Sequence, residues 1–419
     1  MKPEIKERIA QIRRGVVPTG YKKAAGAIVP QHWKIRAVGD VLTESRVPGN
    51  LGDVAKKITV KLWNKGVVEK REIHQGSSNT KYYKRRQGQF IYSKLDFLNC
   101  AFGLVPPELD GYESTLDLPA FDMSGIEPCY FLLYVTQRRF YERWGQTSAN
   151  GGRKAKRISP EDFMAFPLIF PPLEEQRRIA EILTAQDKII ALKERRLAEK
   201  RRQKTGLAQR LLTGKTRLPG FDGEWKKIKL RKLLKERKAY SPKGREFPHV
   251  TLSTEGIYPK SERYDRDHLV KTEDKEYKIT RKGDICYNPA NLKFGVICVN
   301  NFGDAIFSPI YVTFELVGDV ALGFLGNYLM RWDFINAVRK YEEGTVYERM
   351  AVKPEDFLKF EISLPTFEEQ QAIAEVLTCA DREIEALQRD LELEKRKKKA
   401  LMQLLLTGVV RVNSRRRTA

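Results

Sequence analysis

Two long segments of the chain carry apolar residues at the three- and four-residue spacing of one helix face. In the segment nearer the C-terminus these positions are Leu377, Ala380, Ile384, Leu387, Leu391, Leu401 and Leu405, with Glu394 and Lys398 interrupting the series. The matching positions of the earlier segment are Leu183, Gln186, Ile190, Lys193, Leu197, Lys200, Lys204, Leu207 and Leu211. This spacing predicts two long helices that pack along one stripe. Because the earlier stripe is more polar, we expect its contact face to be narrower or shifted towards Ile189 and Leu192.

Both predicted helices have clear ends. Pro171 and Pro365 precede them, and the acidic pair that follows each proline suits the positive end of a helix. Gly214 and Gly408 stand where a left-handed cap would end each helix. A helix of about 39 residues is roughly 58 Å long. We expect the two helices to pack antiparallel and hold the globular parts apart; the alternative is two separate exposed helices.

The remaining segments alternate short apolar runs with glycine and proline. Residues 130–133 and 295–299 are typical of them, and such runs predict short strands with tight turns, mixed with a few helices. Residues 4–14 have the apolar spacing of a short helix. The residues that end it resemble residues 407–410, so this helix would complete the pattern in a circle.

The sequence contains an internal duplication. Residues 160–163 recur as residues 354–357, and the match continues without a gap to residues 211–214 and 405–408. About half of the paired residues are identical, which is far beyond chance. Weaker matches join Trp33 to Trp225, residues 88–92 to 283–287, and residues 102–103 to 294–295. The chain is therefore two copies of one unit, a variable globular part followed by a preserved helical part.

Composition and charge narrow the class of partner. The 419 residues include 77 Lys and Arg against 54 Asp and Glu, a net charge of +23. Such a balance favours a polyanionic partner, most often nucleic acid. The longest apolar run, residues 129–135, is far shorter than the roughly 20 residues that span a bilayer, and charges near Met1 argue against a signal peptide. We therefore expect a cytoplasmic protein with no membrane partner.

Motifs for catalysis are incomplete. The five cysteines are far apart and only four histidines are present, so we expect no zinc site. Residues 214–216 resemble the end of a phosphate-binding loop, but Gln209 stands where that loop needs glycine. Residues 288–291 lack the second proline and the aromatic residue of an amino-methyltransferase motif. Residues 276–278 fit a nuclease Glu-x-Lys element without its Pro-Asp partner. A catalytic role is therefore unsupported.

Basic and aromatic residues interleave in both globular parts. Lysine and arginine neutralise phosphates, and arginine also reads base edges. A solvated surface accounts for each cluster alone, but less well for their recurrence at related places in both copies. The candidate DNA-binding residues are Lys81, Tyr82, Tyr83, Lys84, Arg85, Arg86, Arg138, Arg139, Arg143, Arg153, Lys154, Lys156, Arg157, Lys293 and Arg349.

Several motifs together resemble a known family. Pro-Glu-Asp-Phe, a later proline, Glu-Glu-Gln-x-x-Ile-Ala-Glu-x-Leu-Thr and Leu-Leu-Thr-Gly occur twice at fixed spacing, as in the specificity subunit of type I restriction–modification systems. Residues 218–225 resemble the start of that family's second target-recognition domain, and residues 283–289 with 308–311 resemble its interior. The chain departs from the family at Cys379, and residues 150–152 differ from residues 343–345.

The resemblance implies an α+β fold. Two mixed α/β target-recognition domains would be separated by two long antiparallel coiled-coil helices and related by a pseudo-twofold repeat. The expected boundaries are 1–29 for an N-terminal helical segment completing the circular repeat, 30–172 for the first recognition domain, 173–216 for the central helix, 217–366 for the second recognition domain, and 367–419 for the C-terminal helix and basic tail.

The resemblance also implies a function without catalysis. Each domain would read half of a bipartite sequence in double-stranded DNA. Two modification subunits, which carry S-adenosylmethionine and methylate adenine N6, would dock on the chain. Two restriction subunits, where a system has them, would add ATP and Mg²⁺, so no cofactor is expected in this chain. The alternatives are a stand-alone DNA-binding regulator and a methyltransferase acting alone.

The resemblance adds two groups of candidate residues. Tyr287, Asn288 and Thr345 join the DNA-binding set. The preserved starts of the two helices are expected to bind the modification subunits, because two identical partners require the same residues twice. These partner-binding candidates are Glu174, Glu175, Gln176, Ile179, Leu183, Glu368, Glu369, Gln370, Ile373 and Leu377.

Overall fold

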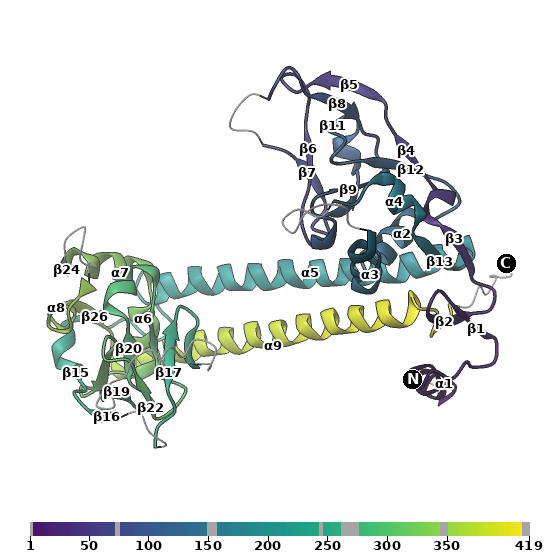
Figure 1. Cartoon of the computed structure of the whole chain (residues 1–419). Coiled ribbons are helices and arrows are strands. Elements are labelled where there is room, and N and C mark those ends of the chain that lie inside the picture. Colours follow the sequence, from purple (N-terminus) through teal and green to yellow (C-terminus); the bar gives the residue numbers. More distant parts are fainter. Residues whose placement is uncertain are drawn as a thin grey trace. The chain divides into compact units, whose positions relative to one another are not determined.

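A computed structural model of the chain describes residues 3–71, 76–148, 157–242, 246–260, 276–343 and 351–412. The chain divides into two compact units. The first unit contains Met1–Leu192 and Leu391–Ala419, and the second contains Lys193–Asp390. Each unit combines a globular part of helices and strands with portions of two long helices (Figure 1).

The two long helices have the expected length. Helices α5 (Leu173–Leu211) and α9 (Phe367–Leu405) each contain 39 residues. Each helix is followed by a glycine in the left-handed conformation, with φ of 71° at Gly214 and 70° at Gly408. The amides of these glycines donate to the carbonyls of Leu211 and Leu405, as in a glycine-capped helix end. The helix and cap predictions are therefore confirmed.

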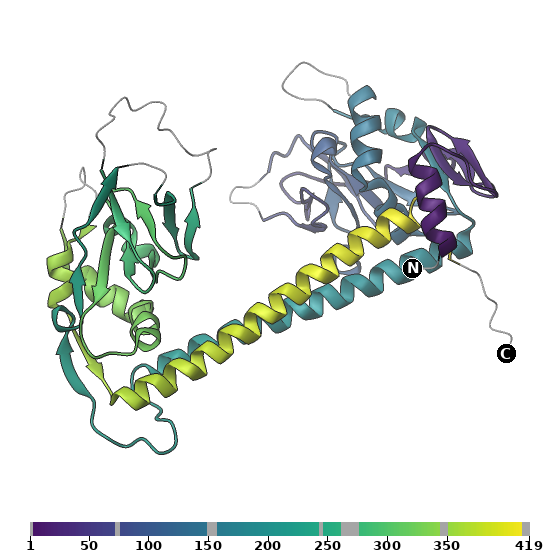
Figure 2. The same ribbon diagram turned by 90° about the horizontal axis from the view of Figure 1, so that it is seen from below.

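In each unit α5 and α9 lie side by side, α5 drawn in teal and α9 in yellow (Figures 1 and 2). The bonded pairs are Gln186–Glu394 and Asp187–Lys398 in the first unit, and Lys193–Asp390, Lys200–Glu383 and Lys204–Asp381 in the second. Residue numbers rise along α5 as they fall along α9, so the helices are antiparallel. The polar positions of the predicted stripes therefore bond to the opposite helix, in most cases through a carboxylate that lies beside its stripe. The expected shift towards Ile189 and Leu192 is wrong, because both side chains are exposed.

The globular part of the first unit is built on two antiparallel sheets. One has the order β10 (Phe102–Leu104), β9 (Phe90–Tyr92), β12 (Ala120–Met123) and β4 (Leu42–Ser45). The other has the order β11 (Glu113–Ser114), β8 (Lys81–Lys84) and β5 (Pro48–Leu51). Three further antiparallel pairs are β6 (Ile58–Val60) with β7 (Val67–Glu69), β3 (Lys34–Ala37) with β13 (Pro167–Phe170), and β1 (Tyr21–Ala24) with β2 (Ala27–Pro30).

The second unit repeats this topology. Its larger sheet has the order β21 (Ile297–Val299), β20 (Ile285–Tyr287), β23 (Val312–Leu316) and β15 (Leu234–Glu236), and its smaller sheet has β22 (Ala305–Phe307), β19 (Glu276–Thr280) and β16 (Tyr240–Pro242). The corresponding pairs are β17 (Val250–Ser253) with β18 (Gly256–Pro259), and β14 (Lys226–Lys229) with β26 (Glu361–Leu364). A short pair joins β24 (Glu342–Glu343) to β25 (Ala351–Val352). The shared strand order confirms the duplication.

Both units also contain short helices. In the first unit they are α1 (Pro3–Arg13), α2 (Pro128–Val135), α3 (Arg138–Ser148), α4 (Pro160–Ala165), η1 (Val38–Asp40), η2 (Phe97–Asn99) and η3 (Pro107–Leu109). In the second they are α6 (Leu322–Leu329), α7 (Trp332–Val338), α8 (Pro354–Lys359), η4 (Leu230–Lys232), η7 (Pro289–Phe294) and η8 (Arg339–Tyr341). Five helices of the first unit, α2, α3, α4, η1 and η2, have counterparts in α6, α7, α8, η4 and η7 of the second. Helix α1 confirms the short helix predicted for residues 4–14.

One weak match between the copies was misaligned. Helix η2 ends at Cys100 and η7 ends at Gly295, both in the left-handed conformation, and each leads into an equivalent strand, β10 or β21. Asn99 and Cys100 therefore correspond to Phe294 and Gly295, whereas the sequence match used residues 102–103. A two-residue Phe-Gly identity is too short to locate the cap, which the backbone conformation does locate.

The preserved Pro-Glu-Asp-Phe motif has a structural role. Its proline is the first residue of α4 and α8, and its acidic residues lie in the first helical turn, where they suit the helix dipole. Phe163 and Phe357 are fully buried, and their rings lie 5.0 Å from those of Tyr92 and Tyr287. The motif thus seats one aromatic ring in the core of each unit.

Candidate nucleic-acid interface

The preserved helix starts are anchored within their own units. The side-chain amide of Gln176 donates to the Pro171 carbonyl at 2.8 Å and its oxygen accepts from the Glu127 amide at 2.9 Å. Gln370 makes the equivalent bonds with Pro365 and Ala321, both at 2.9 Å. Each glutamine therefore satisfies one carbonyl and one amide that would otherwise be buried without partners.

The preserved carboxylates behave in the same way. Glu175 is buried and contacts His32 at 2.9 Å. Glu369 is buried and accepts two hydrogen bonds from Arg217, at 2.6 and 2.7 Å. The two copies thus pair one equivalent acid with different basic side chains, His32 and Arg217.

Most of the partner-binding predictions therefore need correction. Gln176, Ile179, Leu183, Gln370, Ile373 and Leu377 are at most 2% exposed, and Glu175 and Glu369 are also buried. These residues recur because each helix packs against its own globular part, so they do not reach an external partner. Of the predicted set, Glu174 and Glu368 are exposed.

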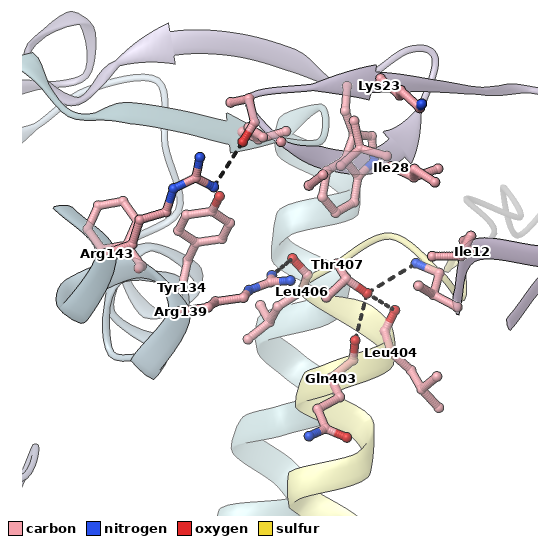
Figure 3. Close-up of a pocket in the computed structure, with 18 of the residues that line it drawn as sticks. Ile12, Lys23, Ile28, Tyr134, Arg139, Arg143, Gln403, Leu404, Leu406 and Thr407 are labelled. Atoms are coloured by element: carbon pink, nitrogen blue, oxygen red, sulfur yellow. Dashed lines mark hydrogen bonds between the residues drawn. The ribbon is translucent and has the colours of Figure 1, made fainter. Parts of the chain in front are cut away.

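Arg139 is part of the first unit's own framework. Its guanidinium donates to the Leu406 carbonyl at the end of α9, at 3.0 Å, as Figure 3 shows. In the second unit Arg331 makes the same contact with the Leu212 carbonyl at 2.7 Å. This contact closes a helix end, where backbone carbonyls lack helical partners. Its occurrence in both units gives Arg139 a structural role, and because the side chain is also exposed its DNA contact stays a prediction.

Arg143 lies beside this helix end. It donates to the Ala25 carbonyl at 3.1 Å, and its guanidinium carbon lies 4.8 Å from the centre of the Trp144 ring (Figure 3). A cavity of about 850 Å³ opens here among α1, the β1–β2 hairpin, α3 and the end of α9. Arg143 remains exposed on its wall.

Two neighbouring arginines of the first basic cluster have opposite environments. Arg85 is fully buried and donates to the Ser114 hydroxyl at 2.7 Å and the Ser45 carbonyl at 2.8 Å. Burial lowers the pKa of Arg85 to about 10. The prediction that Arg85 contacts DNA is therefore wrong, because its guanidinium is enclosed by backbone and hydroxyl acceptors. Arg86 is exposed.

The rest of this cluster lies on strand β8. Lys81 and Lys84 are exposed, while Tyr82 and Tyr83 are half-buried. The Lys57 ammonium lies 5.4 Å from the centre of the Tyr82 ring, which adds a cation–π contact. Exposure does not alternate along this strand: Lys81 and Lys84, three residues apart, point to opposite faces, and the two tyrosines between them are half-buried. Both exposed lysines remain candidates for contacts with phosphate groups.

The other predicted DNA contacts are scattered. Arg138 is exposed and pairs with Glu142 at 2.6 Å, and Arg157 is exposed and lies 3.6 Å from Asp117. The remaining predictions in these loops, Arg153, Lys154, Lys156, Thr345 and Arg349, lie outside the described residues.

Two predictions in the second unit are wrong. Tyr287 is fully buried and donates its hydroxyl to the Val352 carbonyl at 2.9 Å. Asn288 is buried, and its side chain accepts from the amides of Ala290 and Asn291 at the start of η7. The family-like interior motif thus builds the core and a turn. Lys293 is half-buried, with its ammonium 5.3 Å from the centre of the Phe294 ring.

Sequence reasoning missed two exposed aromatic residues, Trp63 and Phe294. Trp63 lies in the turn between β6 and β7, next to the exposed Leu62. Turns between strands normally carry glycine, proline and small polar residues. The sequence did contain a signal for this site, the apolar pair Leu62 and Trp63 in a turn flanked by Lys61 and Lys65.

Other kinds of site are not indicated. Across the part of the chain that the structure describes, no cluster of three or more His, Cys, Asp or Glu side chains could hold a metal ion. Within the same residues, no helix is both long and apolar enough to cross a membrane.

Comparison with known proteins agrees with the architecture. The family model described as the type I restriction modification DNA specificity domain matches residues 123–200 and 223–395. The MjaX type I restriction enzyme specificity subunit of Methanocaldococcus jannaschii is 24% identical over 435 aligned positions, covering 94% of this chain and 97% of the relative. The MjaVIII specificity subunit of the same organism is 22% identical over 428 positions, covering 94% and 96%.

Solved structures share the fold. A chain from a study of complex assembly and conformational transition of the type I R-M system has a TM-score of 0.54 and 19% identity, covering 91% of this chain and 99% of its own. The S subunit of a type I restriction–modification system from M. genitalium has a TM-score of 0.51 and 11% identity, covering 89% and 96%.

Two units with the same strand order define a protein with an internally duplicated recognition fold. The chain belongs to the type I restriction–modification DNA specificity family. Members of this family are the non-catalytic DNA-recognition subunits of their systems, and they assemble with modification and restriction subunits.

Proposed function

We propose that the chain reads a bipartite sequence in double-stranded DNA, with one half-site for each unit. The observation that carries the proposal is a shared framework with different surfaces. Strand β8 exposes Lys81 and Lys84, whereas in the equivalent strand β19 Lys278 is buried and pairs with Glu236. A common scaffold that presents different side chains supports two different readings.

We further propose that two modification subunits dock on equivalent patches of the two helices. Each patch contains three exposed residues at seven-residue spacing, which keeps them on one helix face, and their charges match between the two copies. The outer strip consists of Glu174, Glu181 and Lys188 in the first unit and Glu368, Glu375 and Arg382 in the second. Since the buried preserved residues are explained by folding, these exposed ones need another reason to recur. The same partner binding twice supplies one.

A hollow beside the first of these patches supports the docking proposal. A cavity of about 340 Å³ is lined by residues of α5 and α2, among them Glu181, Thr184, Lys188 and Cys129. In this arrangement S-adenosylmethionine belongs to the modification subunits, and ATP and Mg²⁺ to restriction subunits. The alternatives of a stand-alone regulator and a lone methyltransferase both leave the recurrence of the outer strip unexplained.

The test of bipartite reading is an exchange of the first recognition region. Residues 38–166 would be replaced by those of a relative, which leaves the β3–β13 pair and Gln176 in place. Gln176 accepts from a backbone amide at position 127, so the contact does not depend on the side chain there. Mapping methylated adenines with the assembled complex should show one half of the target changed. A change in both halves, or in neither, would contradict the proposal.

A further inference from the structure

The turn between β6 and β7 exposes an indole ring in a conformation that disfavours side chains. Trp63 is 59% exposed, with φ of 60°, and the following residue, Asn64, has φ of 53°. The left-handed region costs energy for any residue with a Cβ, less for asparagine than for tryptophan, whereas glycine, which has no Cβ, adopts it freely. A tryptophan there gains little from burial, so its own packing does not account for the strain.

The rest of the first unit holds this turn in place. The amides of Trp63 and Asn64 donate to the carbonyls of Asn99 and Cys100, both at 2.8 Å. The Lys61 amide donates to the Gly66 carbonyl at 2.9 Å and closes the hairpin. The indole is therefore presented from a fixed backbone. Strain that the surrounding structure maintains is a feature of functional sites.

The second unit exposes an aromatic ring at the position equivalent to Asn99, the residue that bonds this turn. Phe294 is also 59% exposed. It is the residue that corresponds to Asn99, whose carbonyl accepts from Trp63 in the first unit. The two rings thus come from different segments of the fold, and Phe294 occupies the position whose backbone bonds the Trp63 amide in the first unit. Basic residues accompany both: Lys61 and Lys65 flank Trp63 and are exposed, and Lys293 adjoins Phe294.

The differences between the surroundings of Trp63 and those of Phe294 indicate which ligand these rings bind. A protein partner that is the same at both units would select the same residues twice, as in the outer strip. Trp63 and Phe294 differ in type and in the segment that carries them. Under the proposed function, the half-sites of DNA are what differ between the units. Lysine beside an exposed aromatic ring matches duplex DNA, whose backbone offers phosphates and deoxyribose and whose grooves offer apolar base edges.

We propose that Trp63 and Phe294 each pack against a base or deoxyribose of the half-site that their own unit reads. The neighbouring lysines contact the adjacent phosphates. This inference rests on the proposed bipartite reading and names a residue that carries it in each unit.

The test uses the full chain assembled with its modification subunits and duplexes containing the target found by methylation mapping. Trp63→Ala should weaken binding to the intact target at least about fivefold, as loss of an aromatic–base contact does. On a duplex whose first half-site is scrambled, Trp63→Ala should cause no further loss of affinity relative to the unaltered complex. Phe294→Ala should likewise cause no further loss on a duplex whose second half-site is scrambled. Trp63→Phe should recover most of the affinity.

Matched controls are Val54→Ala in the first unit and Ile310→Ala in the second, which also remove exposed apolar side chains. Thermal unfolding of each variant verifies that it folds, and light scattering follows assembly. Unchanged DNA affinity with Trp63→Ala and Phe294→Ala would overturn the inference. Loss of assembly instead of DNA affinity would also overturn it and would make the corner a protein-docking site. If the unaltered complex shows no preference for either half-site, the proposed function itself fails.

Discussion

At the scale of single residues, neighbours in the sequence have opposite roles. Arg85 is enclosed by Ser45 and Ser114, while Arg86 is exposed one position later. Composition treats both as equivalent basic residues, because it does not show that acceptors from two other segments enclose only Arg85. The useful evidence for a DNA contact is therefore exposure together with charge.

This contrast predicts opposite effects of two adjacent substitutions. Arg85→Leu should lower the free energy of unfolding by about 2–4 kcal/mol, because buried acceptors lose a charged donor. Arg86→Ala should leave stability within about 0.5 kcal/mol. It should instead weaken DNA binding and reduce the salt slope by about 1. Urea unfolding and salt-dependent DNA titration measure the two effects; equal effects of both substitutions would contradict the assignment.

A second prediction concerns the helix anchor of the second unit. Gln370→Ala should cost about 1–3 kcal/mol, because the Pro365 carbonyl and Ala321 amide lose their partner. The exposed neighbour provides the control, since Gln371→Ala removes a similar side chain without a buried bond. Thermal unfolding would distinguish them. If Gln370→Ala instead left stability intact and abolished partner assembly, the preserved glutamine would be an external contact after all.

At the scale of elements, each long helix has several distinct faces. One face packs against a globular part through residues such as Leu183 and Leu377. Another faces the antiparallel helix through pairs such as Lys204–Asp381. The outer strip remains exposed. The residues preserved between the copies therefore include both positions that stabilise the fold and positions that are proposed to bind a partner. Only the burial of each side chain distinguishes the two groups.

The outer strip yields a third prediction. Glu181→Lys combined with Glu375→Lys should weaken assembly with the modification subunits, because both exposed charges of a repeated contact are reversed. Exposed single charges contribute little to stability, so the fold should be unaffected. The control reverses exposed acids that the copies do not share, Glu199→Lys with Glu392→Lys. Light scattering reports the mass of the complex, and equal losses in both double variants would argue against a specific strip.

At the scale of the whole chain, segments from near both ends of the sequence meet in the first unit. The end of α9 belongs to the first unit, where Tyr21 donates to the Gly408 carbonyl at 2.8 Å and Arg8 to the Val409 carbonyl at 3.3 Å. The end of α5 belongs to the second unit through Arg331. Each unit therefore holds the start of one long helix and the end of the other. Because both units share the two long helices in this way, a change in helix length affects both units.

The fourth prediction tests helix length as the determinant of half-site spacing. Seven residues inserted after Leu192 and seven after Asp390 would lengthen both helices by about 10 Å with little change of face. That length is close to three base pairs at ~3.4 Å each. Methylation of a library with varied spacers should show the optimum lengthened by about three base pairs, with both half-sites unchanged.

The control is a seven-residue insertion in α5 alone. It should displace pairs such as Lys193–Asp390 on one side of the insertion and lower stability. An optimum that stays the same after the matched insertion would refute the helix-length prediction. Tolerance of many spacers before insertion would do so too, since a flexible connection has no preferred length.

Local periodicity and repetition were sufficient for the framework. The three-and-four spacing, the prolines before each helix and the glycines after it located both long helices, because these signals act within a few residues. The repeated motifs located the duplication and the family. Net charge indicated the class of ligand. None of these depends on which distant residues meet.

Tertiary structure decided the roles of individual side chains. Gln176 recurs as Gln370 because each meets a distant backbone amide, at Glu127 and Ala321, which spacing along the chain does not reveal. Arg85 lost its predicted role to acceptors from two other segments. Trp63 acquired a proposed DNA contact because the carbonyls of Asn99 and Cys100 hold its turn in the left-handed conformation. Burial, pairing and strain are properties of contacts between distant segments, so they emerge only when the chain is folded.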